Sequence, residues 1–338
     1  MPSEALSEFH AHFLKRAGAA GILPFAEFMK MALYAPGLGY YSGDRRRIGR
    51  SPDADFFTSS SLGPVFGELV AAACAEILGP NAPAHHAFVE IGADPAGDSP
   101  GGVLAGISHP FAGAVALGLR DALAIPRRAV VFSNELFDAQ PCHRVIRTAA
   151  GWDELGVACR GGALVEAALP EPTPEVISIL DRLPSSAPEG YRIDLPLAAA
   201  ALAARIAALP WAGLFVAFDY GKPWEELAND TPAGTIRAYS RHRQCDDLLA
   251  DPGTQDLTCH VCWDWIGAAL VKNGFQPPVI ESQEEFLVRH AGAALQGIAA
   301  AEAGRFSLKK LAMMHLLNPG DMGRKFQVLW ARRDEPAP

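Results

Sequence analysis

The chain has 338 residues, 49% of them hydrophobic and 20% charged, which is typical of a globular protein with one large or two modest domains. Its formal net charge of −9 argues against a nucleic-acid-binding protein, because such proteins meet phosphates with clustered lysine and arginine. No apolar run reaches the length of a membrane span, and six scattered cysteines indicate free thiols in the cytoplasm rather than a disulfide framework.

The first 80 residues are predicted to contain helices and a long loop. Helical patterns cover the segments "SEALSEFHAHFLKRAG", "PFAEFMKMALY" and "GPVFGELVAAACAEIL". Residues 35–60, between the second and third helices, are rich in glycine, proline, serine and charge. Long loops in compact domains are often lids, so we expect residues 1–80 to form N-terminal helices and a lid loop.

Residues 81–338 are predicted to form one domain in which apolar strands alternate with helices. The predicted strands are 87–91, 113–119, 130–134, 214–219 and the late segment "FQVLWAR". Short strand-like runs at about 142–170 suggest inserted hairpins, and a helical region around the substrate is expected at about 222–318.

The alternation of strands and helices predicts an α/β fold with a mostly parallel sheet covered on both faces. We expect the strands 87–91, 130–134 and 214–219 to lie side by side in that sheet. Ligands of such sheets bind outside the carboxyl ends of the strands. The polar strand ends, Glu90, Asn134, Glu135 and Asp219, therefore mark the expected site.

Seven blocks of sequence, in order, resemble the MidA family of methyltransferase-like proteins. They are "ALYAPGLGYYS", "IGRSPDADFFTSSSLGPVFGELVA", "SNELFDAQPCHRV", "FDYG", "GTIRAYSRHR", "DDLLADPGTQDLTCHV" and "NPGDMGRKFQVL". The resemblance implies a class I, Rossmann-like methyltransferase fold with an extra helical and loop region around the substrate cleft. It also implies S-adenosylmethionine (SAM) as cofactor and a protein as substrate or partner. The mitochondrial relatives are linked to assembly of respiratory complex I through methylation of an arginine.

The expected cofactor loop departs from the family pattern, which resembles an acid followed by Gly-x-Gly-x-Gly. Glu90 and Gly92 match it and Gly97 follows in the same loop, but Asp94 and Ala96 stand in place of the second and third glycines. Glycine lets the backbone approach a ligand, and a carboxylate at position 94 would repel the carboxylate of SAM. This pattern predicts weak or lost SAM binding.

The segment after this loop is also short. About 42 residues separate Gly92 from Asn134, whereas three helices and two strands need roughly 50–60 residues. A strand–helix pair is therefore predicted to be missing or shortened. The family places an acid for the ribose hydroxyls at the end of its second strand, where this chain has Leu117 or Gly118. Asp121 is the nearest acid and is the candidate for that role.

The segment "SNELFDAQP" supplies the candidate catalytic residues Asn134, Glu135 and Asp138. Paired carboxylates can hold a guanidinium through bidentate bonds, and an acid near the nitrogen can accept its proton. A helix cap with solvated acids is the alternative interpretation. The resemblance also suggests substrate-binding roles for Tyr41, Asp219, Tyr220, His242, Asp256 and His260, against simple turns and local loop bonding as the alternative.

The pair Cys259 and Cys262, with His242 and Cys245 nearby in sequence, has the spacing of a zinc motif. A single Cys-x-x-Cys without a second well-spaced pair is a weak signal, and the family resemblance implies no metal. We therefore expect no metal site.

Two hypotheses follow. The first is an enzyme that transfers a methyl group from SAM to a protein side chain, most plausibly an arginine nitrogen. The second is a partner-binding or assembly protein that kept the cleft and lost the cofactor, and Asp94 and the short segment favour it. A homodimer is a further expectation that no motif tests.

Overall fold

The computed structural model describes residues 4–42, 63–93, 102–240, 243–304 and 306–335. The chain forms two compact units, each assembled from three separate stretches of sequence. The first unit contains residues 1–44, 137–202 and 222–265, and the second contains residues 45–136, 203–221 and 266–338. The sequence-based boundary after residue 80 divides the chain differently and stays a prediction.

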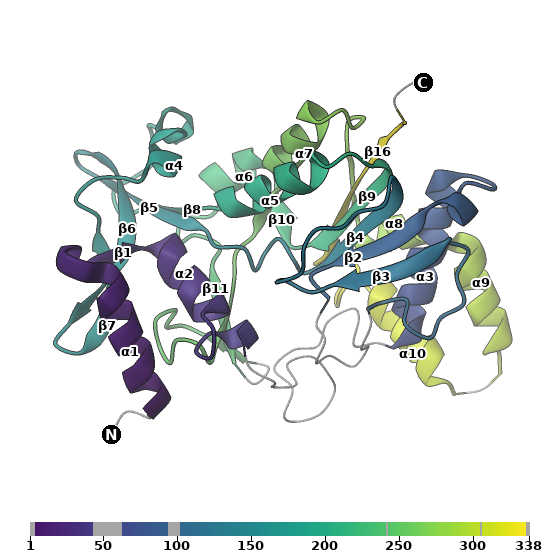
Figure 1. The fold of residues 1–338 in the computed structure, drawn as a ribbon, viewed down its shortest axis with the longest axis horizontal. Helices are drawn as coiled ribbons and strands as arrows, with labels where there is room; N and C mark the ends of the chain where they lie inside the picture. The colour runs from purple at the N-terminus through teal and green to yellow at the C-terminus, as the bar shows by residue number, and fades with distance from the viewer. Residues whose placement is uncertain (1–3, 43–62, 94–101, 241–242, 305, 336–338) are drawn as a thin grey trace. The chain divides into compact units, whose positions relative to one another are not determined.

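The second unit is built on a six-stranded sheet in the order β15–β16–β9–β4–β2–β3 (Figure 1). The strands are β2 (Ala87–Ile91), β3 (Gly113–Leu117), β4 (Arg128–Asn134), β9 (Ala212–Asp219), β15 (Val279–Ser282) and β16 (Gln327–Arg333). The strands β3, β2, β4 and β9 are parallel, while β16 and β15 run antiparallel. The prediction that β2, β4 and β9 lie side by side in a mostly parallel sheet is confirmed.

Strand β9 shows why the central strands read as continuous apolar runs. Its side chains alternate between the two faces of the sheet, and all eight residues are buried. Leu214, Val216 and Phe218 join the core on one face. On the other face the ring of Phe215 lies 6.4 Å from that of Phe275.

Four helices form the layer that covers the first of these faces. They are α3 (Pro64–Leu78), α8 (Gln283–His290), α9 (Gly292–Ala301) and α10 (Leu308–Leu317), and they share one hydrophobic core with the sheet. Their starts follow local sequence signals. Pro64 occupies the first turn of α3, Ser282 and Glu285 form a capping box at α8, and the Ser307 hydroxyl accepts from the third residue of α10.

The segment between β2 and β4 is short, as the sequence predicts. Among its described residues, 92–93 and 102–127, β3 is the one strand and no helix forms. The chain passes from the end of β3 to the start of β4 through residues 118–127 alone. Within the described part of the chain, β3 pairs only with β2 and forms the end of the sheet.

The first unit contains a five-stranded antiparallel sheet in the order β1–β6–β5–β8, with β7 beside β6. The strands are β1 (Ile22–Pro24), β5 (His143–Thr148), β6 (Gly151–Arg160), β7 (Ala163–Ala168) and β8 (Arg192–Leu195). The hairpins predicted at about 142–170 are β5–β6 and β6–β7. Their sheet also recruits β1 from the N-terminal region.

Further helices and strands complete the described fold. In the first unit they are α1 (Glu4–Ala17), α2 (Phe25–Tyr34), α4 (Pro174–Ile177), α6 (Trp224–Asn229), β11 (Arg237–Ser240), β12 (Arg243–Cys245), β13 (Asp256–Thr258) and β14 (Val261–Cys262). The elements β10 (Gly221–Lys222), α5 (Leu197–Ala207) and α7 (Trp263–Lys272) contribute residues to both units. Strand β11 lies between β12 and β13 in a three-stranded sheet.

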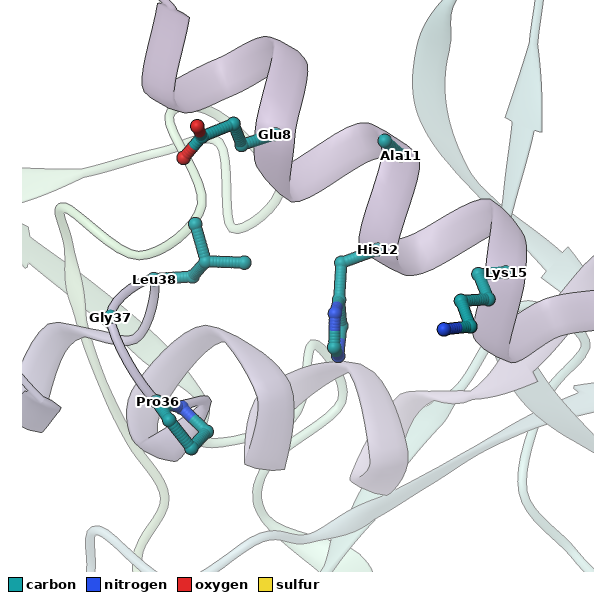
Figure 2. Close-up of a pocket in the computed structure, with 7 residues that line it drawn as sticks. All are labelled: Glu8, Ala11, His12, Lys15, Pro36, Gly37 and Leu38. Atoms are coloured by element: carbon teal, nitrogen blue, oxygen red, sulfur yellow. The ribbon is translucent and has the colours of Figure 1, made fainter.

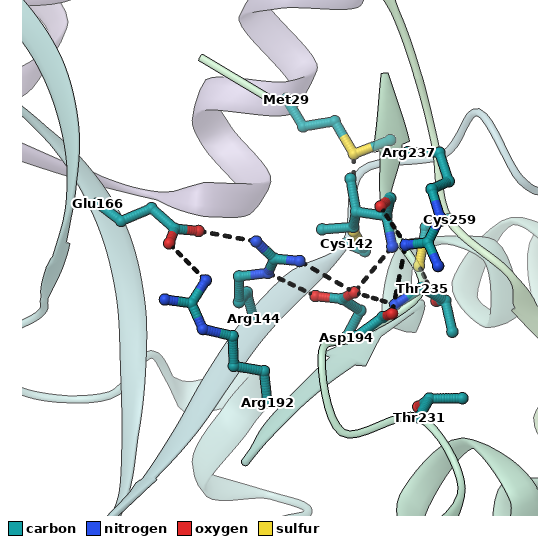
Figure 3. Close-up of polar contacts among 12 residues, drawn as sticks. Met29, Cys142, Arg144, Glu166, Arg192, Asp194, Thr231, Thr235, Arg237 and Cys259 are labelled. Atoms are coloured by element: carbon teal, nitrogen blue, oxygen red, sulfur yellow. Dashed lines mark hydrogen bonds and ion pairs between the residues drawn. The ribbon is translucent and has the colours of Figure 1, made fainter. Parts of the chain in front are cut away.

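A buried ion-pair network holds β11 close to the five-stranded sheet (Figure 3). Nε of Arg144 donates to Asp194 at 2.7 Å, and its Nη1 donates to Glu166 at 2.8 Å. The Asp194 carboxylate also accepts from the backbone N–H groups of Thr235 at 2.5 Å and Ile236 at 2.9 Å. Arg144 and Asp194 are 3% and 1% exposed, so removing either one would leave the other buried without its partner.

Candidate functional site

The carboxyl end of β4 carries a strained residue. Glu135 follows β4 directly and has φ +52°, a left-handed conformation that residues other than glycine seldom adopt. Its backbone N–H donates to Phe218 O at 2.9 Å, which ties it to β9. Such strain persists where the surrounding structure enforces it, and it concentrates at functional sites.

Asn134, the last residue of β4, uses only one end of its side-chain amide. Its Nδ2 donates to Glu135 Oε1 at 3.0 Å, which leaves Oδ1 as the free end of the amide. Asn134 Oδ1 and Ser133 Oγ are buried without a hydrogen-bond partner among the described residues. Buried polar atoms normally have partners, so this strand end can receive a donor from a bound molecule.

The side chain of Glu90 is hydrogen-bonded to the backbone beyond the end of β2, at Val103. Its Oε2 accepts from the Val103 N–H at 2.5 Å. Burial raises the pKa of Glu90 to about 7, although the Val103 bond acts in the opposite direction. A Cβ atom at Gly102 would lie 2.5 Å from Glu90 Oε2, so the backbone at Gly102 packs directly on this carboxyl group.

Gly92 occupies the turn after β2, where the sequence places the first glycine of the cofactor loop. Its φ is +86°, and a Cβ atom there would lie 2.8 Å from Leu136 Cδ1. Its N–H donates to Leu117 O at 2.8 Å, which joins the ends of β2 and β3. The backbone conformation and the close packing each require glycine.

Asp121 folds back to the end of β3. Its Oδ2 accepts from the Gly118 N–H at 2.7 Å, and a Cβ atom at Gly118 would lie 3.4 Å from that oxygen. The exposed carboxylate of Asp121 therefore stands beside the position where the sequence lacks an acid. The acid at this strand end is thus supplied by a residue three positions after Gly118, and not by a residue of the strand end itself.

The first unit gathers two acids and three tyrosines, which we call the acid–tyrosine cluster: Tyr34, Tyr41, Asp138, Tyr239 and Asp256. The Tyr41 hydroxyl donates to Asp256 Oδ1 at 3.1 Å, and the Tyr34 hydroxyl donates to Ala139 O at 2.7 Å. The rings of Tyr34 and Tyr41 stack with centroids 5.5 Å apart. Asp138 and Asp256 are 2% and 4% exposed.

Both acids influence all three tyrosines. Burial, followed by the charges of Asp256 and Asp138, raises the pKa values of Tyr34 and Tyr41 well above the ordinary range. Burial also raises the pKa of Tyr239, with Arg237 opposing it and the same two acids adding to it. The tyrosines therefore stay neutral, and among them Tyr41 donates to a carboxylate, that of Asp256.

Local structure explains how the cluster forms. Tyr34 is the last residue of α2, and the turn that follows brings Tyr41 back against it. Gly39 makes that turn, because a Cβ there would lie 2.6 Å from the Ala35 backbone nitrogen. Tyr239 and Asp256 face each other across β11 and β13, and Asp138 O accepts from the Cys259 N–H at 2.8 Å, just beyond β13.

The comparisons with known proteins agree with this architecture. A family model described as "Putative S-adenosyl-L-methionine-dependent methyltransferase" matches residues 107–280, more than half of the chain. The chain belongs to the MidA family of SAM-dependent methyltransferases.

Two solved structures from Burkholderia thailandensis resemble this MidA-family chain over its whole length. One is bound to S-adenosyl-homocysteine, is 28% identical, covers 100% of this chain and 96% of its own, and has a TM-score of 0.84. The other is a native structure with the same identity and coverage and a TM-score of 0.79. The Danio rerio protein named "Protein arginine methyltransferase NDUFAF7, mitochondrial" is 27% identical over 315 residues, which cover 75% of this chain and 70% of that protein.

The remaining site residues predicted for this MidA-family chain are placed as follows. Asp219 ends β9, is fully buried and accepts from the Tyr220 N–H at 3.0 Å, while the Tyr220 ring packs 4.2 Å from that of Phe326. His260 Nδ1 is buried without a hydrogen-bond partner among the described residues. Burial, then Lys222 and Arg237, lowers the pKa of His260 to about 4. Gly97 and His242, like Asp94 and Ala96, lie outside the described residues.

Sequence reasoning missed Tyr34 and Tyr239 as members of the cluster. Tyr34 lies in the block "ALYAPGLGYYS" and Tyr239 in "GTIRAYSRHR", both of which carry the family resemblance. The signal that could have found them is the presence of a tyrosine in each block that also supplies a predicted substrate residue. The distance along the chain from Tyr34 to Asp256 hides their proximity.

The cysteine motif of this MidA-family chain is part of the interior. Cys259 and Cys262 are each 1% exposed, and burial raises the pKa of Cys262 to about 12. Cys259 Sγ lies 3.6 Å from the Thr235 hydroxyl, and Cys142 Sγ lies 3.6 Å from Met29 Sδ (Figure 3). Across the described ranges, no group of three or more His, Cys, Asp and Glu side chains could hold a metal ion. The expectation of no metal site stays a prediction.

A separate hollow lies along α1 (Figure 2). It has a volume of about 450 Å³ and is lined by Glu8, Ala11, His12 and Lys15 of α1 and by Pro36, Gly37 and Leu38. None of its lining residues belongs to the acid–tyrosine cluster.

No helix within the described residues is long and apolar enough to span a membrane.

Proposed function

We propose that this MidA-family chain transfers a methyl group from SAM to a side-chain nitrogen of an arginine in a partner protein. The observation that carries the proposal is the acid–tyrosine cluster, in which two buried acids lie among three neutral tyrosines. The name of the Danio rerio relative, a protein arginine methyltransferase, supports the choice of acceptor. A guanidinium is the one protein cation that offers a planar fork of donors to carboxylates.

The cluster suits a guanidinium in two ways. Carboxylates accept its N–H groups through charge-assisted bonds, and tyrosine rings attract a cation placed over their faces. We assign guanidinium binding to Asp138 and Asp256, with Tyr41 holding Asp256 in place through its 3.1 Å bond. The proposal keeps Asp219, Tyr220, His242 and His260 on the substrate side, as the family resemblance implies.

Proton removal is the second task, and it needs an acid besides Asp138 and Asp256. As the new bond between nitrogen and the methyl carbon forms, the nitrogen must lose one proton to a base. We assign that role to Glu135, which the strained backbone holds at the end of β4, with Asn134 Nδ2 bonded to its Oε1 at 3.0 Å. A positioned base of this kind contributes roughly 10²–10⁴-fold to a rate.

The described strand ends of the second unit fit a SAM-like ligand. SAM supplies an electrophilic methyl group on a sulfonium. Asn134 Oδ1 has no partner among the described residues and can accept from the ligand, and the exposed Asp121 carboxylate can accept from ribose hydroxyls. We assign Gly92 to the close backbone approach, and Glu90 to ordering the loop through Val103.

We further propose that SAM binds this chain weakly. Asp94 adds a negative charge to the loop that also contains Gly97, and Asp94 and Ala96 replace two glycines. The fold-back of Asp121 retains an acid, so the loop is the main cause of weakening.

We also propose a cytoplasmic location, since none of the six cysteines forms a disulfide.

Calorimetric titration with SAM and with S-adenosyl-homocysteine tests cofactor binding. We expect dissociation constants above about 100 µM for the native chain and at least tenfold lower values for the Asp94→Gly, Ala96→Gly double variant. Asp121→Asn should weaken binding to either protein. Low-micromolar binding by the native chain would contradict the proposed weakening, and no binding by the double variant would favour a non-catalytic partner-binding protein.

Methyl transfer is tested with methyl-labelled SAM at millimolar concentration and an arginine-containing peptide library, followed by hydrolysis and chromatography for methylarginine. Glu135→Gln should lower the rate by about 10²-fold or more, and Asp138→Asn should raise the KM for peptide. Asp181→Asn, at an exposed acid of the first unit, is the matched control. Label on lysine alone would refute the arginine acceptor.

A further inference from the structure

The second unit exposes a concentrated group of large apolar side chains. Four of the eleven that the described residues leave exposed lie between residues 306 and 314. They are Phe306 at 85% exposure, Leu308 at 64%, Leu311 at 37% and Met314 at 56%. Single exposed apolar residues are ordinary, but four within nine residues form a patch.

Three of these residues form a stripe along α10. Leu308, Leu311 and Met314 follow one another at intervals of three, which places them on one side of the helix. The other side of α10 is already used, because Ala312 and Leu316 are buried in the core. The α10 stripe therefore remains outside the core of its own unit.

The neighbouring helix α9 exposes mostly small, uncharged side chains, in contrast to the large apolar ones of α10. Residues 292–301 contain no charged side chain, and the exposed positions include Ala293, Gln296, Gly297 and Ala300. A Cβ atom at Gly297 would meet no other atom within 4 Å. We call this the α9 face. Solvent-facing helix surfaces usually carry charges, so an uncharged face made mostly of alanine and glycine, on a helix that contacts α10, is unusual.

Two of the three basic side chains of α10 are paired within the chain. Lys309 Nζ lies 2.7 Å from a Glu68 oxygen, and His315 is paired with Asp321. Lys310 is the one exposed cation among residues 306–317 of the described chain. Among the described residues, this surface lacks the cluster of basic groups that an anionic membrane or an acidic peptide would need.

We propose that the α9 face and the α10 stripe together bind a second copy of this chain. A two-fold arrangement places the large side chains of one α10 stripe on the small residues of the partner's α9 face, and the reverse. Both halves of the contact are present on one molecule, which is the requirement for an isologous interface. A surface with few charges also suits self-association of a chain whose net charge is −9.

The size of the patch sets the expected strength. Each helix has ten residues and is about 15 Å long, so the pair covers a few hundred Å² on each copy. Stable interfaces bury about 800 Å² on each partner. The dimer should therefore be weak, with a dissociation constant on the order of ten to a hundred micromolar, and should not depend on methyl transfer.

Sedimentation velocity over about 1–300 µM chain tests the proposal. The mean mass should rise from 35.9 kDa toward twice that value, and added salt should strengthen association by screening the like net charges. Gly297→Glu and Leu311→Lys should each raise the dissociation constant at least tenfold. Both are exposed positions where the new residue favours a helix, so folding is retained. Ile177→Glu, at a 56% exposed residue of the first unit, is the control.

A mixture of the Gly297→Glu and Leu311→Lys proteins separates this arrangement from others. Opposite charges meet at one of the two contacts, so the mixture should associate more tightly than either variant alone. A native chain that stays monomeric at 300 µM, or a dimer that neither substitution weakens, overturns the proposal. A monomeric native chain whose binding to phosphatidylserine vesicles is lost on Leu311→Glu would assign the surface to a membrane instead.

Discussion

Replacing Glu90 by glutamine should change how stability depends on pH. Burial raises the pKa of Glu90 from an ordinary value of 4.5 to about 7, so the folded chain holds this proton more tightly than the unfolded chain does. Its contribution to stability is complete below about pH 4.5 and is lost as the pH rises through about 7. Glutamine resembles the protonated acid and can still accept from the Val103 N–H.

The magnitude follows from the shift of about 2.5 pH units, at roughly 1.4 kcal/mol each. The free energy of unfolding of the native chain, measured relative to Glu90→Gln, should fall by about 3 kcal/mol between about pH 4.5 and pH 8. Urea unfolding of both proteins at several pH values measures it. Subtracting one protein from the other removes every titrating group that they share.

Glu189→Gln, at an exposed acid of the first unit, is the control and should give a constant difference across the same range. A Glu90→Gln difference that varies by less than about 0.5 kcal/mol would refute the reasoning. It would mean that the carboxyl group behind Gly102 is as well solvated in the folded chain as in the unfolded one.

Three other changes should affect stability. His260 has its pKa lowered to about 4, so its stabilising effect is present above about pH 6.5 and is lost toward pH 4; His260→Gln should remove roughly 2–3 kcal/mol of acid sensitivity in urea unfolding. Arg144→Met leaves Asp194 buried without its cation and should cost about 3–5 kcal/mol, and a double variant with Asp194→Asn that lost the full sum would contradict the coupling. Gly92→Ala should lower the melting temperature through about 1–3 kcal/mol of backbone strain, which Leu136→Ala would not fully relieve.

The central sheet was predictable because its strands carry their own signal. Strands β2, β4 and β9 are largely buried on both faces, so each reads as a mainly apolar run. That no helix forms among the described residues between β2 and β4, 92–93 and 102–127, agrees with the short length of this segment. The pairing of β1 with β6 could not be predicted from the sequence. The three residues Ile22–Pro24 are too few to show a periodicity, and their partners lie more than 130 residues later in the chain.

The candidate site was predictable in its parts and less so in its geometry. Family resemblance singled out Glu135, Asp138 and Asp256, but the left-handed backbone of Glu135 has no sequence signal, since glycine is the residue that normally marks such a position. The return of Asp121 to Gly118 depends on the exact course of a turn. Tyr34 reaches the acids only through the fold of the first unit.

The interleaved course of the chain has a consequence for its biosynthesis. The chain passes from one unit to the other five times, and the first unit is complete only when residue 265 has been made. Strand β1 leaves the ribosome long before β6, and at about 5–20 residues per second the delay is on the order of ten seconds. During that time the apolar side of α2 has no sheet to cover it. The nascent chain is therefore a natural client for chaperones, and no single cut or truncation can release either unit as an intact folding domain.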